Sequence, residues 1–191
     1  MKRFVLLALT LALLRAEGAV EVGAFPQPSG IAGGISTNLP IGRWTADKRI
    51  LRLTLAFTAT PTNSVLVSFG ADRDGDGILS AEELELTAGW DCGLWILDPC
   101  GFTPPMTGTP SVTGGRLSLD LDLRLDASGR VAHGSVLSDG SPLFGLSADA
   151  PPGWLFSKSW DLARLDVRGL PPTSGNAVIV YANDGMVIRI D

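Results

Sequence analysis

Oxygen-bearing side chains recur at alternate positions in one short segment of the chain, residues 72–83. Calcium takes about six to eight oxygen ligands, and a short segment supplies them most easily from alternate positions. Carboxylates occupy positions 1, 3, 5 and 12 of the segment, and a glycine occupies position 6, where the chain must turn sharply. The predicted calcium ligands are Asp72, Asp74, Asp76, the backbone carbonyl of Ile78, Ser80 acting through a water, and Glu83.

Residues 72–83 resemble an EF-hand calcium loop, because every position of D-x-D-x-D-G-x-x-x-x-x-E is filled and position 8 is the apolar Leu79. An ordinary EF-hand enters its loop from a helix, whereas Val65 to Gly70 has the pattern of a strand. The loop is therefore similar to the strand–loop–helix variants of bacterial extracellular and periplasmic proteins. A dockerin module would carry two such loops, and no second one is complete in this sequence.

The loop has a less specific interpretation, an acidic turn that is solvated and binds nothing. Its carboxylates at the ligand positions would then repel one another without a cation. If calcium does bind, a single loop between a strand and a short helix has little to open, unlike the paired hands of a sensor. We therefore expect a structural ion, bound with an affinity of roughly 10⁻⁴–10⁻³ M.

Cys92 and Cys100 lie eight positions apart, shortly after the loop. Outside the cytosol two such thiols tend to pair, so the sequence predicts a disulfide between them. A metal site built on the pair is disfavoured, because His133, the single histidine, is far away in the sequence.

Trp90 and Trp95 flank Cys92 and permit two interpretations. Aromatic faces pack well on sugar rings, so the two side chains could form a platform for a glycan. The simpler interpretation, which we favour, is that they belong to the core or cover it, and the same applies to Trp154 and Trp160.

No segment carries a recognisable catalytic motif. Asp120, Asp122 and Asp126 could be a glycosidase-like set, but they alternate with leucines and are better explained as the wet face of a strand. A nucleophile elbow, a Walker A loop, a dinucleotide-binding glycine motif and zinc-type Cys/His spacing are all absent from the sequence. We therefore expect a protein that is not an enzyme.

Strands must position the loop, because period-two alternation of apolar and polar residues dominates the chain. The strands are expected at residues 51–57, 65–69, 117–125, 163–167 and 177–182, the last of them joined to 186–190 in a hairpin. One short helix is expected at Ala81 to Ala88, where Ser80 and Glu83 form a capping box. The pattern predicts an all-β fold, an antiparallel two-sheet sandwich of which the jelly roll is one form.

The first nineteen residues have the order of a secretory signal peptide: basic Lys2 and Arg3, an apolar run from Phe4 to Leu14, then small residues. The run is too short to span a bilayer, although a retained membrane anchor is the alternative. Removing residues 1–18 leaves 12 basic and 19 acidic residues, a net charge of −7. Such a balance disfavours nucleic acid and anionic membranes as partners.

Three regions follow from these patterns: a signal peptide at 1–19, an extended Gly/Pro-rich segment at 20–43, and a sandwich domain at 44–191 with a calcium-loop and disulfide insertion at about 70–102. We expect a protein that is secreted, periplasmic or on the cell surface. Its expected role is non-catalytic, in adhesion, surface assembly or as an accessory domain, with a glycan or a cell-surface or matrix protein as candidate partner. The alternative is a calcium-dependent carbohydrate-binding module or a carbohydrate-active enzyme.

Overall fold

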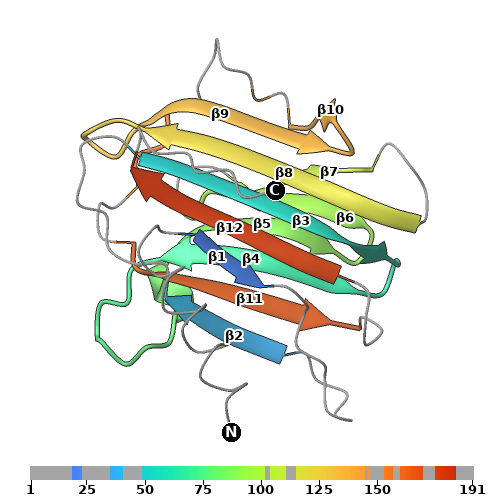
Figure 1. The fold of residues 1–191 in the computed structure, drawn as a ribbon, viewed down its shortest axis with the longest axis horizontal. Helices are drawn as coiled ribbons and strands as arrows, with labels where there is room; N and C mark the ends of the chain where they lie inside the picture. Colours follow the sequence, from blue (N-terminus) through green and yellow to red (C-terminus); the bar gives the residue numbers. More distant parts are fainter. Residues whose placement is uncertain are drawn as a thin grey trace, which may run out of the picture.

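Two antiparallel six-stranded sheets pack face to face and make up almost all of the regular structure (Figure 1). The computed structural model describes residues 19–22, 35–40, 49–101, 104–110, 115–144, 146, 153–156, 160–169 and 175–183. The predicted all-β, two-sheet antiparallel sandwich is confirmed.

Sheet A holds the strands in the order β1-β12-β3-β8-β9-β10, and sheet B holds them in the order β2-β11-β4-β5-β6-β7. The strands of sheet A are β1 (Ala19–Val22), β12 (Gly175–Asn183), β3 (Arg49–Ala59), β8 (Gly115–Leu125), β9 (Val131–Ser138) and β10 (Ser141–Pro142). The strands of sheet B are β2 (Ile35–Pro40), β11 (Leu162–Arg168), β4 (Ser64–Gly70), β5 (Leu84–Asp91), β6 (Leu94–Asp98) and β7 (Met106–Gly108).

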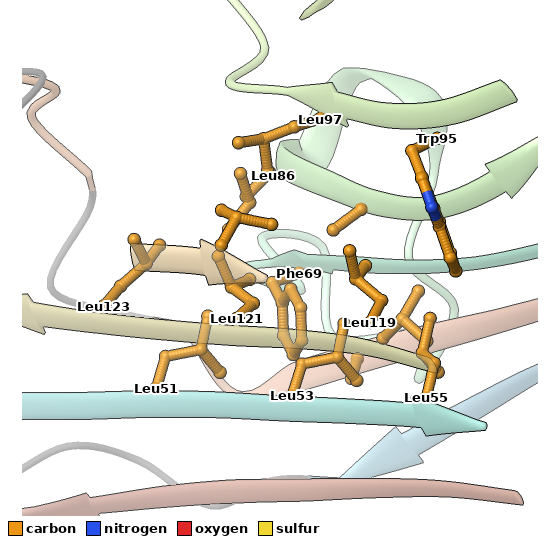
Figure 2. Close-up of a cluster of buried hydrophobic side chains, with 14 of the residues drawn as sticks. Leu51, Leu53, Leu55, Phe69, Leu86, Trp95, Leu97, Leu119, Leu121 and Leu123 are labelled. Carbon is orange, nitrogen blue, oxygen red and sulfur yellow. The ribbon is translucent and has the colours of Figure 1, made fainter. Parts of the chain in front are cut away.

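The core lies between the sheets and is built from the inward positions of the alternating strands (Figure 2). In sheet A the leucines of β3 and β8 face inward in register, as in the pair Leu53 and Leu121. Phe69, Leu86 and Trp95 meet them from sheet B. Because successive side chains of a strand point to opposite faces, the same strands turn their polar residues to the outside.

Two parts of the expected extended segment 20–43 are described, and both belong to strands. Ala19–Val22 pairs with β12 at one edge of sheet A, and Ile35–Pro40 pairs with β11 at one edge of sheet B. An edge strand is held by backbone hydrogen bonds on one side only, so it needs little of the apolar alternation that reveals a central strand. The extended chain was therefore predictable here, but its place in the two sheets was not.

The predicted helix at Ala81 to Ala88 is wrong beyond its first turn. A 3₁₀ helix, η1 (Ala81–Glu83), is followed directly by β5, which pairs with β4 on one side and β6 on the other. Only the first turn carries local helix signals, whereas Glu85 to Ala88 alternates between half-buried and buried positions. Two neighbouring strands satisfy the backbone of β5, and this pairing outweighs a weak helix propensity.

The predicted disulfide between Cys92 and Cys100 is not formed, and both thiols are free. Cys92 lies in the two-residue turn between β5 and β6, and Cys100 lies beyond the far end of β6. The five residues of β6 alone extend over about 16 Å. A disulfide needs Cα atoms within about 7 Å, so the fold separates the two cysteines. Residues 84–91 and 94–98 form two neighbouring strands of sheet B.

Other sequence expectations fall partly outside the described residues. Residues 1–18 of the predicted signal peptide and residues 186–190 of the predicted C-terminal hairpin are not among them. Within the part of the chain that the structure describes, no helix has the length and apolar character needed to cross a membrane.

Candidate metal centre

The acidic loop, residues 71–83, connects β4 to β5 at the end of sheet B and includes η1 as its last three residues (Figure 1). Gly70, which precedes the loop, is paired with Leu84, which follows it, and a β-bulge interrupts the register at this point. The two ends of the loop are therefore adjacent, so that its twelve ligand-pattern residues must turn back on themselves within a short distance.

Three of the predicted ligands converge in the loop. Asp72, Asp74 and Asp76 each offer a carboxylate oxygen, and these oxygens lie within 4.8 Å of one another. The Asp72 carboxylate accepts the backbone N–H of Gly75 at 2.7 Å and that of Gly77 at 2.9 Å. Both glycines have φ of +78°, in the left-handed region that side chains disfavour, so the turn that gathers the carboxylates depends on them.

Glu83, at position 12, lies outside this group of three. One of its oxygens accepts the Arg73 backbone N–H at 2.6 Å, and the other accepts the Ser80 backbone N–H at 2.9 Å and the Ser80 hydroxyl at 2.7 Å. The residue is 5 % exposed. Glu83 thus joins the beginning of the loop to its end, and the predicted contact of the capping box, from the Ser80 N–H to the Glu83 carboxylate, is present.

The two large apolar residues of the loop, Ile78 and Leu79, differ in exposure. The side chain of Ile78, the predicted carbonyl ligand, is exposed, and its backbone N–H donates to Asp76 at 2.7 Å. Leu79 is fully buried and fixes the end of the loop against the sheet.

The carboxylates of the loop differ in their ionisation. Hydrogen bonds from the Arg73 backbone, then from the Ser80 hydroxyl and backbone, lower the pKa of Glu83 from 4.5 to about 2. At Asp74 the hydrogen bond from the Asp76 backbone lowers the pKa, but desolvation and the negative charges of Asp76 and Glu83 outweigh it, and the pKa is raised overall. The loop therefore contains one carboxylate held firmly as an anion and one that its neighbours disfavour as an anion.

The lowered pKa of Glu83 predicts a pH dependence for the metal-free protein. The stability that its hydrogen bonds supply is fully present above the unfolded pKa of 4.5 and is lost as the pH falls through about 2. A carbon-detected NMR titration of the Glu83 carboxyl should therefore show a midpoint near pH 2. Ser80→Ala should move that midpoint upward, because it removes the hydroxyl donor. A wild-type midpoint near 4.5 would contradict the described contacts.

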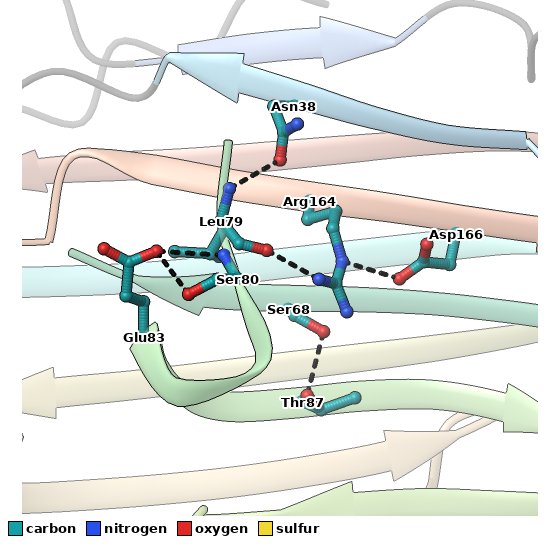
Figure 3. A network of polar contacts seen from close by, with 8 residues as sticks. All are labelled: Asn38, Ser68, Leu79, Ser80, Glu83, Thr87, Arg164 and Asp166. Atoms are coloured by element: carbon teal, nitrogen blue, oxygen red, sulfur yellow. Dashed lines mark hydrogen bonds and ion pairs between the residues drawn. The ribbon is translucent and has the colours of Figure 1, made fainter. Parts of the chain in front are cut away.

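Three residues distant in the sequence hold the loop, and sequence reasoning did not identify them. Asn38 of β2 accepts the Leu79 backbone N–H at 3.1 Å, and Arg164 of β11 donates to the Leu79 carbonyl at 2.6 Å (Figure 3). Asp161, just before β11, accepts the Asp72 backbone N–H at 2.9 Å. These contacts span 41, 85 and 89 residues of sequence. A local motif carries no signal for partners at such separations.

The possible aromatic platform is not present. Trp90 is 4 % exposed and Trp95 is fully buried, and the two rings pack edge to face with centroids 5.3 Å apart. Their indole N–H groups donate to the Thr60 carbonyl at 3.2 Å and to the Ser138 hydroxyl at 2.8 Å. Trp154 and Trp160 are buried as well. The interpretation of these tryptophans as core residues is therefore confirmed.

The aspartates of β8 take part in cross-strand pairs on the outer face of sheet A. Asp122 pairs with Arg52 at 2.9 Å, and Asp120 accepts the Thr54 hydroxyl at 2.8 Å. Asp126 lies in the turn after the strand and accepts the backbone N–H of Ser128 at 2.8 Å. Such pairs are ordinary features of a solvated sheet face.

Comparisons with known proteins find similarity of overall structure only. No family model matches the chain, and no curated protein matches it. Among solved structures, the globular domain of T. cruzi calreticulin is 13% identical with a TM-score of 0.47, over 88% of this chain and 85% of that one. Sheep galectin-11 is 10% identical with a TM-score of 0.37, over 81% and 97%. Galectin LEC-6 of Caenorhabditis elegans is 12% identical with a TM-score of 0.40, over 87% and 96%. At these values the likeness carries no argument about function.

Proposed function

We propose that the protein binds one calcium ion in the acidic loop and that the ion is structural. The observation that carries the proposal is the convergence of Asp72, Asp74 and Asp76, whose oxygens lie within 4.8 Å of one another at the surface. Residues 72–83 hold five acidic residues and one basic residue. Carboxylates so close repel one another in the absence of a cation, and the loop contains too little positive charge to balance them.

The chemistry of the donor set fits calcium. All the candidate ligands are oxygens, which hard cations prefer, and the set lacks the thiolate and imidazole groups that select zinc or copper. Magnesium demands a compact, near-ideal octahedron, whereas a loop that turns at two glycines suits the larger and more variable shell of calcium. The residues that would hold the ion are Asp72, Asp74, Asp76, Glu83, the Ile78 carbonyl and, through a water, Ser80.

A structural role of the ion agrees with the way the loop is attached to sheet B. Its two ends are adjacent at Gly70 and Leu84, Leu79 is buried, and Glu83 already joins the beginning to the end. Bound calcium would neutralise the carboxylates, and the chain around them has no pair of helices to open. We therefore propose a clamp that holds the loop against sheet B, in an exported protein with a non-catalytic accessory, adhesive or surface-assembly role.

Limited proteolysis with trypsin tests the clamp. Strands β4 and β5 flank the loop, so we expect calcium to change protease sensitivity only within residues 71–83. Arg73 offers a cleavage site for trypsin in this region. At calcium concentrations about ten times the expected dissociation constant, binding should reduce the opened population, and hence cleavage, about tenfold relative to chelator. Arg52 and Arg124, in strands of sheet A, should be cleaved equally in both conditions. Cleavage after Arg73 that ignores calcium would refute the clamp.

The carbohydrate-binding alternative has no specific observation in its favour. Its proposed platform, Trp90 and Trp95, lies in the core. All the tryptophans whose side chains the structure describes are buried, which leaves no stacking surface of that kind in the described residues.

A further inference from the structure

We propose that β2 and β11 hold the calcium loop in its binding conformation. Within this arrangement Asn38 is the residue that positions the backbone carbonyl ligand. This inference rests on the proposed calcium function. It concerns residues that lie outside the twelve-residue motif and are brought to it only by the packing of sheet B.

The orientation of the Ile78 carbonyl follows from the contact made by Asn38. The Asn38 side-chain oxygen accepts the backbone N–H of Leu79 at 3.1 Å. That N–H belongs to the same peptide unit as the Ile78 carbonyl. The described chain contains no cis peptide bonds, and in a planar trans unit the C=O points opposite to the N–H. Asn38 therefore directs the Ile78 carbonyl away from β2 and fixes the plane in which it lies.

Arg164 holds the next peptide unit. Its Nη1 donates to the Leu79 carbonyl at 2.6 Å, while its Nε donates to Asp166 at 2.9 Å, so that the guanidinium is itself oriented (Figure 3). The Leu79 side chain between these two contacts is fully buried. Both peptide units around Leu79 are thus tied to sheet B, one to β2 and the other to β11.

The beginning of the loop is tied to the same strand. Asp161, which immediately precedes β11, accepts the backbone N–H of Asp72 at 2.9 Å, and its own N–H donates to the Gly70 carbonyl at 3.2 Å. Sheet B therefore contacts the loop at its first ligand and again directly after its backbone ligand. A loop restrained at both places loses less conformational entropy when it binds an ion.

These contacts couple calcium binding thermodynamically to the pairing of β2 with the rest of sheet B. β2 is an edge strand whose one neighbour in the sheet is β11, and Asn38 is in register with Arg164. If the contact with Asn38 raises calcium affinity, bound calcium must strengthen that contact by the same factor. Calcium would therefore hold an edge strand in place at a distance from the ligands themselves.

Calcium titration calorimetry on the full chain tests the proposal. Asn38→Ala should weaken binding about three- to tenfold, and Arg164→Gln should weaken it about tenfold or more, since a charged donor is lost. Asn38→Asp keeps an acceptor oxygen and should retain most of the affinity. The matched control is Arg52→Gln, which breaks an arginine–aspartate pair of the same 2.9 Å length on sheet A and should leave affinity unchanged.

Hydrogen exchange of the β2 amides tests whether Asn38 couples β2 to calcium. If Asn38 only supported the fold, the exchange rate in β2 would not depend on calcium. Calcium should slow exchange in β2 of the wild-type protein and should not slow it in Asn38→Ala. Unchanged affinity in Asn38→Ala and Arg164→Gln, or β2 exchange that ignores calcium while the wild type binds it, would overturn the inference. If Arg164→Gln impairs folding, the Asn38 pair of variants decides, because it leaves the Arg164–Asp166 pair intact. Absence of binding by the wild type would instead refute the proposed function.

Discussion

We expect the double variant Asp72→Ala with Glu83→Gln to lose calcium binding, with the affinity reduced by at least about 100-fold. Asp72 is the first of the proposed ligands and also accepts the N–H groups of Gly75 and Gly77, so its removal takes away both an anion and the contacts that shape the turn. Glu83→Gln removes a second negative charge from the same site. The measurement is calorimetric titration of the full chain at millimolar calcium.

Glu82→Gln is the matched control for this experiment. Glu82 is exposed, neighbours Glu83, and does not occupy a ligand position, so the loss of one negative charge there, the same change as Glu83→Gln, should leave calcium affinity within about twofold. Circular dichroism should show that all the variants keep the strand content of the wild type. Equal binding by the double variant and the wild type would refute the site, and so would an equal loss in Glu82→Gln.

The second large effect is expected from Gly70→Ala, which should destabilise the protein by about 3 kcal/mol or more. A Cβ atom at this position would lie 1.9 Å from the backbone oxygen of Glu83 and 3.0 Å from the Leu79 side chain. The backbone oxygen cannot rotate away as a side chain can, so the two ends of the loop must separate. Urea unfolding measures the loss of stability, and calcium affinity should fall with it because Glu83 is displaced.

Gly108→Ala distinguishes this clash from a general effect of adding a methyl group at a tight glycine. Its Cβ would meet the Leu143 side chain at 2.8 Å, and the end of a flexible side chain can move. The cost should therefore be below about 1 kcal/mol. A Gly70→Ala protein as stable as Gly108→Ala would show that the loop ends are not in contact as described.

The strands were predictable from the sequence because their signal is local and repeated. Leu117 to Leu125 alternates with polar residues over the whole of β8, and every one of its leucines is buried. A period of two requires only that one face of a strand be covered, whatever covers it. The edge strand β2 is held by backbone pairing with β11, which requires no alternation of apolar and polar residues. Its sequence therefore predicts only extended chain.

Where local sequence signals pointed to another structure, the pairing of β-strands determined the conformation. The capping contact between Ser80 and Glu83 is real, but it starts a single turn and not the helix that it suggested, because β4 and β6 take up the backbone of the next residues. The short spacing of Cys92 and Cys100 suggested a closed loop. A strand between them sets them far apart, and no feature of the cysteines themselves indicates this.

The acidic loop shows most clearly what each level of information decides. The order of its carboxylates and glycines lies within twelve residues, so the identity of the candidate ligands, and the convergence of Asp72, Asp74 and Asp76, could be predicted from the sequence alone. The mounting of the loop could not be predicted, because Asn38, Asp161 and Arg164 reach it across 41 to 89 residues. Ligand spacing is a property of a short chain segment, whereas the direction of the Ile78 carbonyl depends on which strands lie beside the loop once the two sheets have formed.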